Sequence, residues 1–212
     1  MEISHWALYA VVATISIFSP GPAVLLAISN SIRFGLRRVF YSSLGNIVGV
    51  FCVSALAMVG LGAVLKSSAL LFGILKILGA AYLVYLGIKQ WRAKGNIFAR
   101  PTDAQAQEER SDRQLFAQGA TLALTNPKAI LFFTALFPQF IDSTHTLLPQ
   151  FAILTGTFMT ISFCSLMLYG LLARTTRHWF AVPRHARWFN RVSGSLFGLL
   201  GFGLLRLKNG RA

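Results

Sequence analysis

The sequence predicts an all-α polytopic membrane protein with about six transmembrane helices, arranged as two inverted three-helix repeats in which helices 1 and 4 are broken. Three observations predict this fold: the composition, the position of the basic residues, and two prolyl breaks. Of 212 residues, 55% are apolar and 12% are charged, and the mean hydropathy is +0.60. Soluble domains carry about 25% charged residues.

Six apolar stretches reach or approach the roughly 20 residues that a membrane-spanning helix needs. They cover residues 6–32, 39–65, 69–91, 115–141, 147–173 and 192–207, the last being the shortest. No basic residue precedes the first stretch, so we expect it to be retained and not cleaved as a signal. The sequence thus predicts one transmembrane domain over residues 1–212, with repeat one at about 1–92, a polar loop at about 93–114 and repeat two at about 115–212.

The basic residues predict the orientation of the chain in the membrane. Of the 20 Lys and Arg residues, 14 fall in three alternate loops, at 33–38, 89–113 and 174–191. Cytoplasmic loops are enriched in Lys and Arg, so we expect these loops in the cytoplasm and both termini outside. Three basic residues near the C-terminus agree better with a last segment that re-enters the membrane without crossing it. Five spans and six spans therefore remain as alternatives. The net charge of +14 is a topology signal on this interpretation, and no nucleic-acid partner is expected.

The two halves of the chain show weak internal similarity. Residues 76–82 match residues 191–197, and residues 21–26 match residues 126–131 more loosely. Because three spans is an odd number, the second copy has to enter the membrane from the opposite face. Inverted repeats of this kind are typical of transporters, with the binding site where the repeats meet. Chance similarity between apolar helices is the alternative.

Prolines interrupt the first and fourth apolar stretches near their middles. Each interruption has the form of a helix start, with Ser19 or Asn126 as N-cap and a proline at the first helical position. Unpaired backbone groups are costly in hydrocarbon, so broken helices persist where they face protein or a wet cavity. A simple proline kink explains either break alone, whereas two breaks at matching depth favour a functional site.

The breaks expose backbone N–H groups and the positive ends of half-helices, which suit a carboxylate. Lys128 would be costly without a partner in the membrane, so an ionisable role is expected. Asn46 lies between Gly45 and Gly49, whose spacing is itself a helix-packing pattern. The predicted substrate-binding residues are Ser19, Pro20, Gly21, Pro22, Asn46, Thr125, Asn126, Pro127 and Lys128.

The predicted spans contain no Asp, Glu or His. This argues against an intramembrane hydrolase, which needs an acid–base pair, and against a divalent-metal carrier, which needs carboxylates or soft ligands. We therefore expect no catalytic residue, no metal ligand and no cofactor. Cys52 and Cys164 lie inside apolar stretches and indicate neither a disulfide nor a metal site.

Paired motifs resemble those of the LysE/RhtB superfamily, the lysine and homoserine/threonine exporters. The first is Pro20-Gly21-Pro22-Ala23-Val24-Leu25-Leu26 with Gly35-Leu36-Arg37-Arg38, Gly45 and Gly49; the second is Asn126-Pro127-Lys128-Ala129 with Phe132-Phe133 and Pro138-Gln139-Phe140. Residues 78–87 also fit. Val39 departs from the family, which usually has a second glycine there.

The resemblance implies a secondary transporter of the bacterial cytoplasmic (inner) membrane that exports small amino acids or related metabolites in exchange for protons. The expected partners are a small-molecule substrate, an amino acid or derivative, and the lipid bilayer, and a homo-oligomer is compatible with the sequence. Two alternatives remain: a membrane protein without transport, such as an intramembrane enzyme or assembly factor, and a carrier of another solute such as a metal ion.

Overall fold

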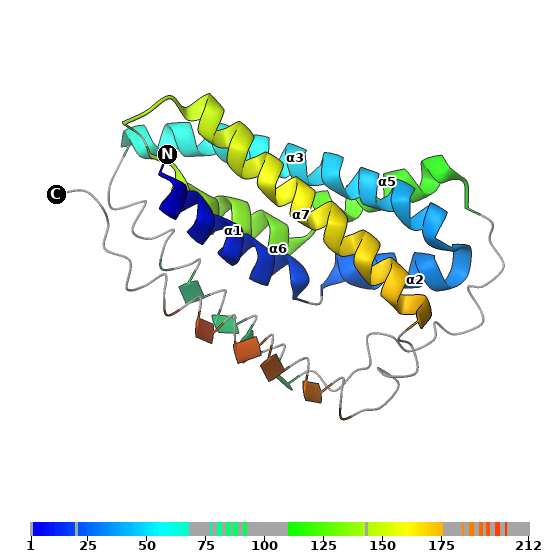
Figure 1. The fold of residues 1–212 in the computed structure, drawn as a ribbon. Helices are drawn as coiled ribbons and strands as arrows, with labels where there is room; N and C mark the ends of the chain where they lie inside the picture. Colours follow the sequence, from blue (N-terminus) through cyan, green and yellow to red (C-terminus); the bar gives the residue numbers. More distant parts are fainter. Residues whose placement is uncertain are drawn as a thin grey trace.

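The computed structural model describes residues 2–19, 21–67, 110–142 and 144–175, together with scattered positions between 77 and 92 and between 184 and 202. The continuous stretches form a bundle of helices without strands (Figure 1), as the sequence predicts. The elements are α1 (Ile3–Phe18), α2 (Pro22–Phe34), α3 (Leu36–Ser67), α5 (Asp112–Leu124), α6 (Pro127–Leu131), the π-helix η2 (Phe132–Leu136), the 3₁₀ helix η3 (Phe137–Phe140) and α7 (Leu147–Thr175).

By length and composition, two to four of these segments can cross a membrane. Leu36–Gly60 of α3 and Leu147–Ala173 of α7 qualify as single helices, and two bent pairs qualify when each pair is taken as one span. These four segments coincide with the first, second, fourth and fifth predicted stretches. The third and sixth stretches, at 69–91 and 192–207, lie outside the continuously described residues, as does the C-terminus.

The first bent span consists of α1 and α2, which meet at an angle of 54°. Pro22 occupies the first position of α2, where a missing N–H costs no intrahelical hydrogen bond. The N-cap is therefore Gly21, the residue directly before it, and the prediction of Ser19 as N-cap is wrong. Ser19 instead ends α1, and its N–H donates to the Ile15 carbonyl at 3.2 Å.

The second bent span begins with a capping box between Ser111 and Gln114 at the start of α5. It bends by 46° between α5 and the segment that follows. Here the predicted cap is confirmed: the Asn126 side chain accepts a hydrogen bond from the Lys128 N–H at 3.1 Å, and Pro127 is the first helical residue. After Leu131 the α-helix gives way to the π-helix η2 and then to the 3₁₀ helix η3, which has Pro138 in its first turn.

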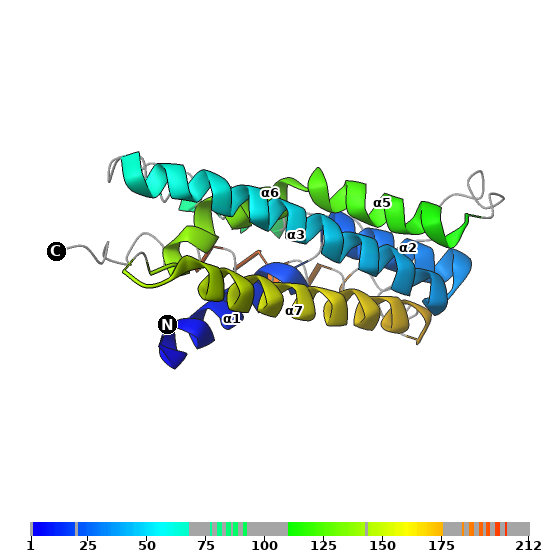
Figure 2. The ribbon, with the colours of Figure 1, turned by 90° about the horizontal axis from the view of Figure 1, so that it is seen from above.

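The two bent spans run antiparallel to each other. His5 contacts Phe140, Tyr9 contacts Phe137 and Phe132, and Ser19 contacts Lys128, so rising numbers on α1 meet falling numbers on the second span. Figures 1 and 2 show the same opposed course. The predicted inversion of helices 1 and 4 is thus present. The complete three-helix repeats and the division at residues 92 and 115 stay predictions, since they involve helices outside the described residues.

Glycines allow α3 and α5 to lie in backbone contact. A Cβ atom on Gly45 would lie 1.9 Å from the Phe116 carbonyl oxygen, and one on Gly119 would lie 1.9 Å from that of Ser42. On Gly49 the corresponding distance to the Ala120 oxygen is 2.6 Å. The packing interpretation of Gly45 and Gly49 is therefore confirmed, and this contact fixes Asn46 beside the second break.

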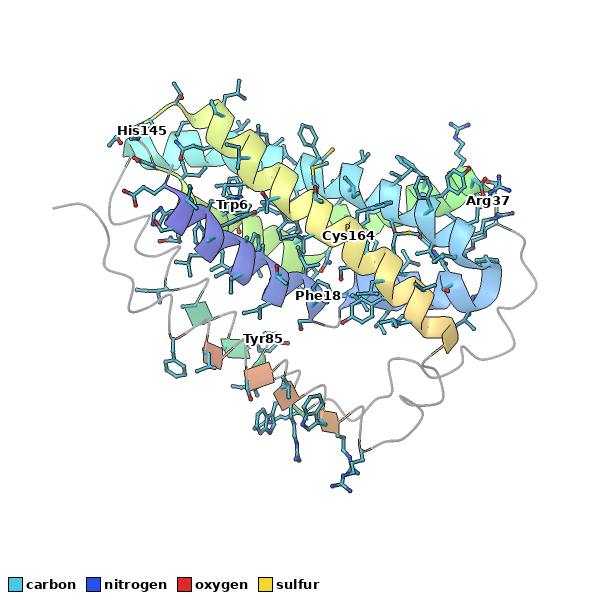
Figure 3. All side chains as sticks on the ribbon, in the orientation of Figure 1. Trp6, Phe18, Arg37, Tyr85, His145 and Cys164 are labelled. Atoms are coloured by element: carbon cyan, nitrogen blue, oxygen red, sulfur yellow. The ribbon has the colours of Figure 1, made fainter. Side chains whose placement is uncertain are left out.

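The loops separate into two ends of the bundle. At one end, Arg38 Nε lies 3.2 Å from a carboxylate oxygen of Asp112, which joins the first turn of α3 to the first residue of α5. At the other end, Trp6 Nε1 donates to Thr157 Oγ1 at 3.1 Å. Figure 3 shows Arg37 and His145 at opposite ends, with Trp6 toward the His145 end. This arrangement agrees with the predicted topology, in which the first and third loops share one side of the membrane.

Candidate functional site

The two breaks meet at a small cavity in the middle of the bundle. Its volume is about 50 Å³. Every spanning segment of the continuously described chain contributes to its wall. The cavity is lined by Ser16, Ile17, Ser19, Gly21, Ala23, Val24, Asn46, Val50, Ala123, Asn126, Lys128, Ala129, Phe158, Ser162 and Leu166.

Lys128 joins the second break to the first. Its ammonium Nζ lies 2.7 Å from the backbone carbonyl oxygen of Ser19 and donates a hydrogen bond to it. The lysine side chain also passes along the backbone of Gly21, where an added Cβ would lie 3.6 Å from Lys128 Cδ. An ammonium inside a membrane is costly without a partner, and this carbonyl is one partner that the fold supplies.

The carbonyl groups at the end of α1 are held by side chains from two other segments. The last carbonyls of a helix have no intrahelical donor. Besides the bond from Lys128 to the Ser19 oxygen, the Tyr169 hydroxyl donates to the Phe18 oxygen at 2.6 Å. The rings of Phe18 and Tyr169 also pack, with centroids 6.2 Å apart. The negative end of α1 thus faces an ammonium and a hydroxyl.

The start of α2 presents the opposite polarity to the same cavity. Within the described residues no side chain caps this helix, and its first intrahelical bond runs from the Leu25 N–H to the Gly21 oxygen at 3.0 Å. Ala23 and Val24, whose N–H groups precede that bond, line the cavity. A helix start carries a partial positive charge and attracts anions.

Neutral polar side chains complete the lining. Ser19 is 3% exposed, and its hydroxyl finds no hydrogen-bond partner in the described part of the chain. The Ser162 hydroxyl lies 3.5 Å from Asn46 Oδ1. Asn126 Oδ1 already accepts the Lys128 N–H, so the second break is capped from within. Among the described residues there is no group of three or more His, Cys, Asp or Glu side chains that could hold a metal.

The predicted site residues divide into three groups. Five line the cavity: Ser19, Gly21, Asn46, Asn126 and Lys128. Three others, Pro22, Thr125 and Pro127, have exposed side chains and do not line it; the Thr125 hydroxyl donates to the Thr121 carbonyl of its own helix. Pro20 lies outside the described residues. The prolines set the geometry of the breaks, whereas the cavity is lined by their neighbours.

Sequence reasoning missed two polar residues of the lining, Ser16 and Ser162. Ser16 lies three positions before Ser19, and this helical spacing places both on one face, so it could have been found. Ser162 belongs to α7, an unbroken span, and no local signal distinguishes it from other small polar residues there.

Apolar clusters pack on either side of the cavity along the bundle. The aromatic cluster, toward the Trp6 end, consists of Tyr9, Phe132, Phe133, Phe137, Phe140 and Phe158. The aliphatic cluster, toward the Arg37 end, consists of Val24, Ala27, Ile28, Val39, Leu166, Tyr169 and Ala173. A water occupies about 30 Å³ of liquid, so the cavity has room for one or two waters and is too small for an amino acid. A solute of that size needs more space than the described residues leave here.

Spanning helices, two of them broken at mid-length around a polar cavity, define a polytopic helical membrane protein with the architecture of secondary transporters. The sequence profile of the LysE type translocator family matches residues 14–208, and the chain belongs to this family.

Named relatives come from several bacteria. The chain is 38% identical over 201 residues to a homoserine/homoserine lactone efflux protein of Salmonella typhimurium, covering 95% of this chain and 96% of the relative. It is 34% identical over 203 residues to a leucine efflux protein of Salmonella choleraesuis, covering 95% and 92%. An uncharacterized membrane protein of Vibrio cholerae is 36% identical over 205 residues, covering 97% of both chains. No solved structure matches the chain significantly.

Proposed function

We propose that this protein exports small amino acids or related metabolites across the cytoplasmic (inner) membrane of a bacterium, and that the cavity between the two breaks is its substrate site. The observation that carries the proposal is the contact between Lys128 and Ser19, which joins the two broken spans at the cavity. Relatives that match nearly the full length are named as efflux proteins for homoserine, homoserine lactone and leucine. Such solutes are small and carry an amino group.

The cavity offers complementary groups to a solute of this kind. The start of α2 and the Lys128 ammonium favour a carboxylate, and the end of α1 favours a cation. Neutral donors and acceptors from Ser16, Asn46 and Ser162 lie beside them. Among the described residues that line the cavity, Lys128 is the one charged side chain, which supports a carrier of neutral zwitterions over an enzyme with an acid–base pair.

Transport would proceed by alternating access around the fixed cavity. Opening the aliphatic cluster admits substrate from the side of the basic loops, and opening the aromatic cluster releases it on the other side. The π-helix η2 carries Phe132 and Phe133, and irregular helical turns of this type are frequent at functional sites. Exchange with protons is the coupling that the family resemblance implies, and an imposed pH gradient would test it.

The deciding experiment is counterflow in proteoliposomes that contain the purified protein. Vesicles loaded with unlabelled L-homoserine or L-leucine are given the labelled compound outside, with protein-free vesicles as control. Transient accumulation of either amino acid supports the proposal. Accumulation of a divalent metal ion without any amino acid favours the metal carrier, and no transport across a wide amino-acid panel favours the enzyme or assembly factor.

The role of the breaks is tested separately. Pro22→Ala and Pro127→Ala each restore a backbone donor and favour a continuous helix across the break. We expect both variants to lose at least about tenfold in counterflow rate, since a straightened span no longer presents its half-helix end to the cavity. Wild-type rates in both variants would remove the basis for placing the site at the breaks.

A further inference from the structure

The end of α1 forms a cation site that the protein fills with its own lysine. Ser19 is buried, and its carbonyl oxygen accepts from the Lys128 ammonium at 2.7 Å. The carbonyl one residue earlier, on Phe18, accepts from Tyr169 at 2.6 Å. Half-helix C-terminal ends in transporters bind cations in this way. Lys128 lies 109 residues after Ser19 in the chain, on the other broken span. Its ammonium is covalently attached to the protein, so it can leave the carbonyl and remain close by.

The same ammonium lies next to the anion-favouring end of α2. A Cβ atom placed on Gly21, the N-cap of α2, would lie 3.8 Å from Lys128 Nζ and 4.0 Å from the Ser19 carbonyl oxygen. The helix end that attracts a cation and the helix start that attracts an anion are therefore separated by only a few ångströms. That separation suits the ammonium and carboxylate of one α-amino acid.

We propose that the Lys128 ammonium is a tethered stand-in for the α-ammonium of the substrate and that a zwitterionic α-amino acid replaces it. The substrate ammonium takes the Ser19 carbonyl oxygen. The displaced Lys128 ammonium then pairs with the substrate carboxylate, which also accepts from the free N–H groups at the start of α2. This inference rests on the proposed function and narrows its substrate class to amino acids with both charged groups unmodified.

The exchange leaves no charged group without a partner. Before substrate enters, the lysine ammonium is bonded to the carbonyl of Ser19. Afterwards that carbonyl holds the substrate ammonium, and the lysine holds the carboxylate. The Ser19 hydroxyl, buried and without a partner among the described residues, supplies one further donor at the same place. A zwitterion brings no net charge into the cavity, so the net charge there is the same before and after the exchange.

Compounds that lack one of the two charges separate this scheme from simple anion binding. An N-acetyl amino acid offers a carboxylate but cannot take the Ser19 carbonyl as an ammonium does. An amino-acid amide offers an ammonium but gives the displaced lysine no anion. In the wild-type protein both compounds should therefore bind at least about tenfold more weakly than the parent, since hydrogen bonds to charged groups are worth that much.

The test measures equilibrium binding to the purified full-length protein in detergent, with L-leucine, N-acetyl-L-leucine and L-leucinamide as probes. The homoserine series is used if counterflow shows homoserine to be the better substrate. In Lys128→Met the stand-in ammonium is gone and the Ser19 carbonyl is free. We expect the variant to bind L-leucinamide at least about tenfold more tightly than the wild type does, and L-leucine more weakly. Thr160→Val, an exposed position on α7, is the matched control and should keep the wild-type order.

The binding measurements decide the inference, and counterflow decides the proposed function. Counterflow of an amino acid establishes transport whether or not the stand-in scheme holds. Equal binding of L-leucine and its N-acetyl derivative to the wild type would overturn the inference while leaving transport intact. It would also be overturned if Lys128→Met, shown to be folded by size-exclusion chromatography, bound L-leucinamide no more tightly than the wild type.

Discussion

Lys128 Nζ lies 2.7 Å from the Ser19 carbonyl oxygen, so a side chain from the second break of the chain closes the exposed end of α1 at the first. The bond links two spans that run in opposite directions, and it does so at the cavity. Any motion that separates the two breaks has to replace this bond. Lys128 is thus placed to respond to the contents of the cavity.

We predict that the charge of Lys128 is needed for transport more than for stability. Lys128→Gln should lower the counterflow rate at least about tenfold, because the carboxylate of the substrate loses its cationic partner. Lys128→Arg keeps the charge and should retain a larger share of the rate. Loss of the bond to the Ser19 carbonyl should cost Lys128→Gln about 1–3 kcal/mol of stability. Thermal unfolding in detergent, measured beside counterflow, checks both parts. An unfolding temperature that does not change when the transported amino acid is added would contradict the assignment.

The contact between α3 and α5 gives a second prediction. Gly119→Ala places a Cβ atom 1.9 Å from the Ser42 carbonyl oxygen, and a backbone atom cannot move aside as a side chain can. Overpacking of this kind costs about 1–3 kcal/mol or more. Gly60→Ala on α3 is the control, since nothing lies within 4 Å of its Cβ. We expect a clearly lower unfolding temperature for Gly119→Ala and no loss for Gly60→Ala. Equal unfolding temperatures would show that α3 and α5 do not pack in this way.

Much of this architecture could be predicted from the sequence because it depends on local signals. Hydropathy gave the bounds of the four described spans to within a few residues, since length and apolarity are what a bilayer requires. The two breaks were visible because proline removes a backbone donor wherever it stands. Gly45 and Gly49 showed their packing role through their spacing alone.

The remainder depends on how distant segments meet, which no local pattern encodes. The sequence predicts Ser19 as an N-cap. In the structure α2 begins two residues later than this prediction requires, at Pro22, so Ser19 lies at the end of α1. The bond from Tyr169 to the Phe18 carbonyl joins residues 151 positions apart. The aromatic side chains of η2 and η3 contact Tyr9 on α1 and Phe158 on α7, again residues that are distant in the chain.

Asp142 gives a prediction for the dependence of stability on pH. Hydrogen bonds from the Thr144 hydroxyl and backbone N–H, and from His145, lower the pKa of the Asp142 carboxyl from 3.8 to about 2. A carboxyl with a lowered folded-state pKa adds stability above its ordinary pKa, and this contribution is lost as pH falls toward the folded value. The stability difference between wild type and Asp142→Asn should therefore be constant above about pH 5 and vanish as the pH approaches about 2.

Thermal unfolding across this pH range measures that difference. Thr144→Val removes the largest cause of the shift and should move the loss to higher pH, closer to the ordinary carboxyl value. A difference that grows on acidification would have the wrong sign and would exclude a stabilising role for this carboxylate.

The predicted orientation can be checked with single cysteines in a protein without Cys52 and Cys164. The side chains of Arg37 and His145 are 82% and 66% exposed and lie at opposite ends of the bundle (Figure 3). In intact cells, a membrane-impermeant maleimide should label His145→Cys at once and Arg37→Cys only after the cells are broken. The reverse pattern would refute the orientation. Ala212→Cys in the same assay distinguishes six spans, which give labelling from outside, from five.

The last prediction concerns the hydrogen bond from Tyr169 to the Phe18 carbonyl, which ties α7 to the end of α1 beside the aliphatic cluster. Tyr169→Phe removes the hydroxyl but keeps the ring that packs on Phe18. An unpaired carbonyl costs about 1–3 kcal/mol. Because the hydrogen bond is present when the aliphatic cluster is closed, its loss destabilises the closed conformation. The variant should therefore open more often toward the Arg37 end, by roughly tenfold for each 1.4 kcal/mol.

Alkylation of buried cysteines in purified protein reports this opening. Ala27→Cys in the aliphatic cluster, where the native side chain is 2% exposed, should react several-fold faster when combined with Tyr169→Phe. Val12 is 7% exposed and is buried together with the aromatic cluster. Val12→Cys should react no faster when combined with Tyr169→Phe, because opening on one side keeps the other closed. Equal acceleration at both positions would mean general loosening of the bundle, and the Tyr169 bond would then have no part in opening one side alone.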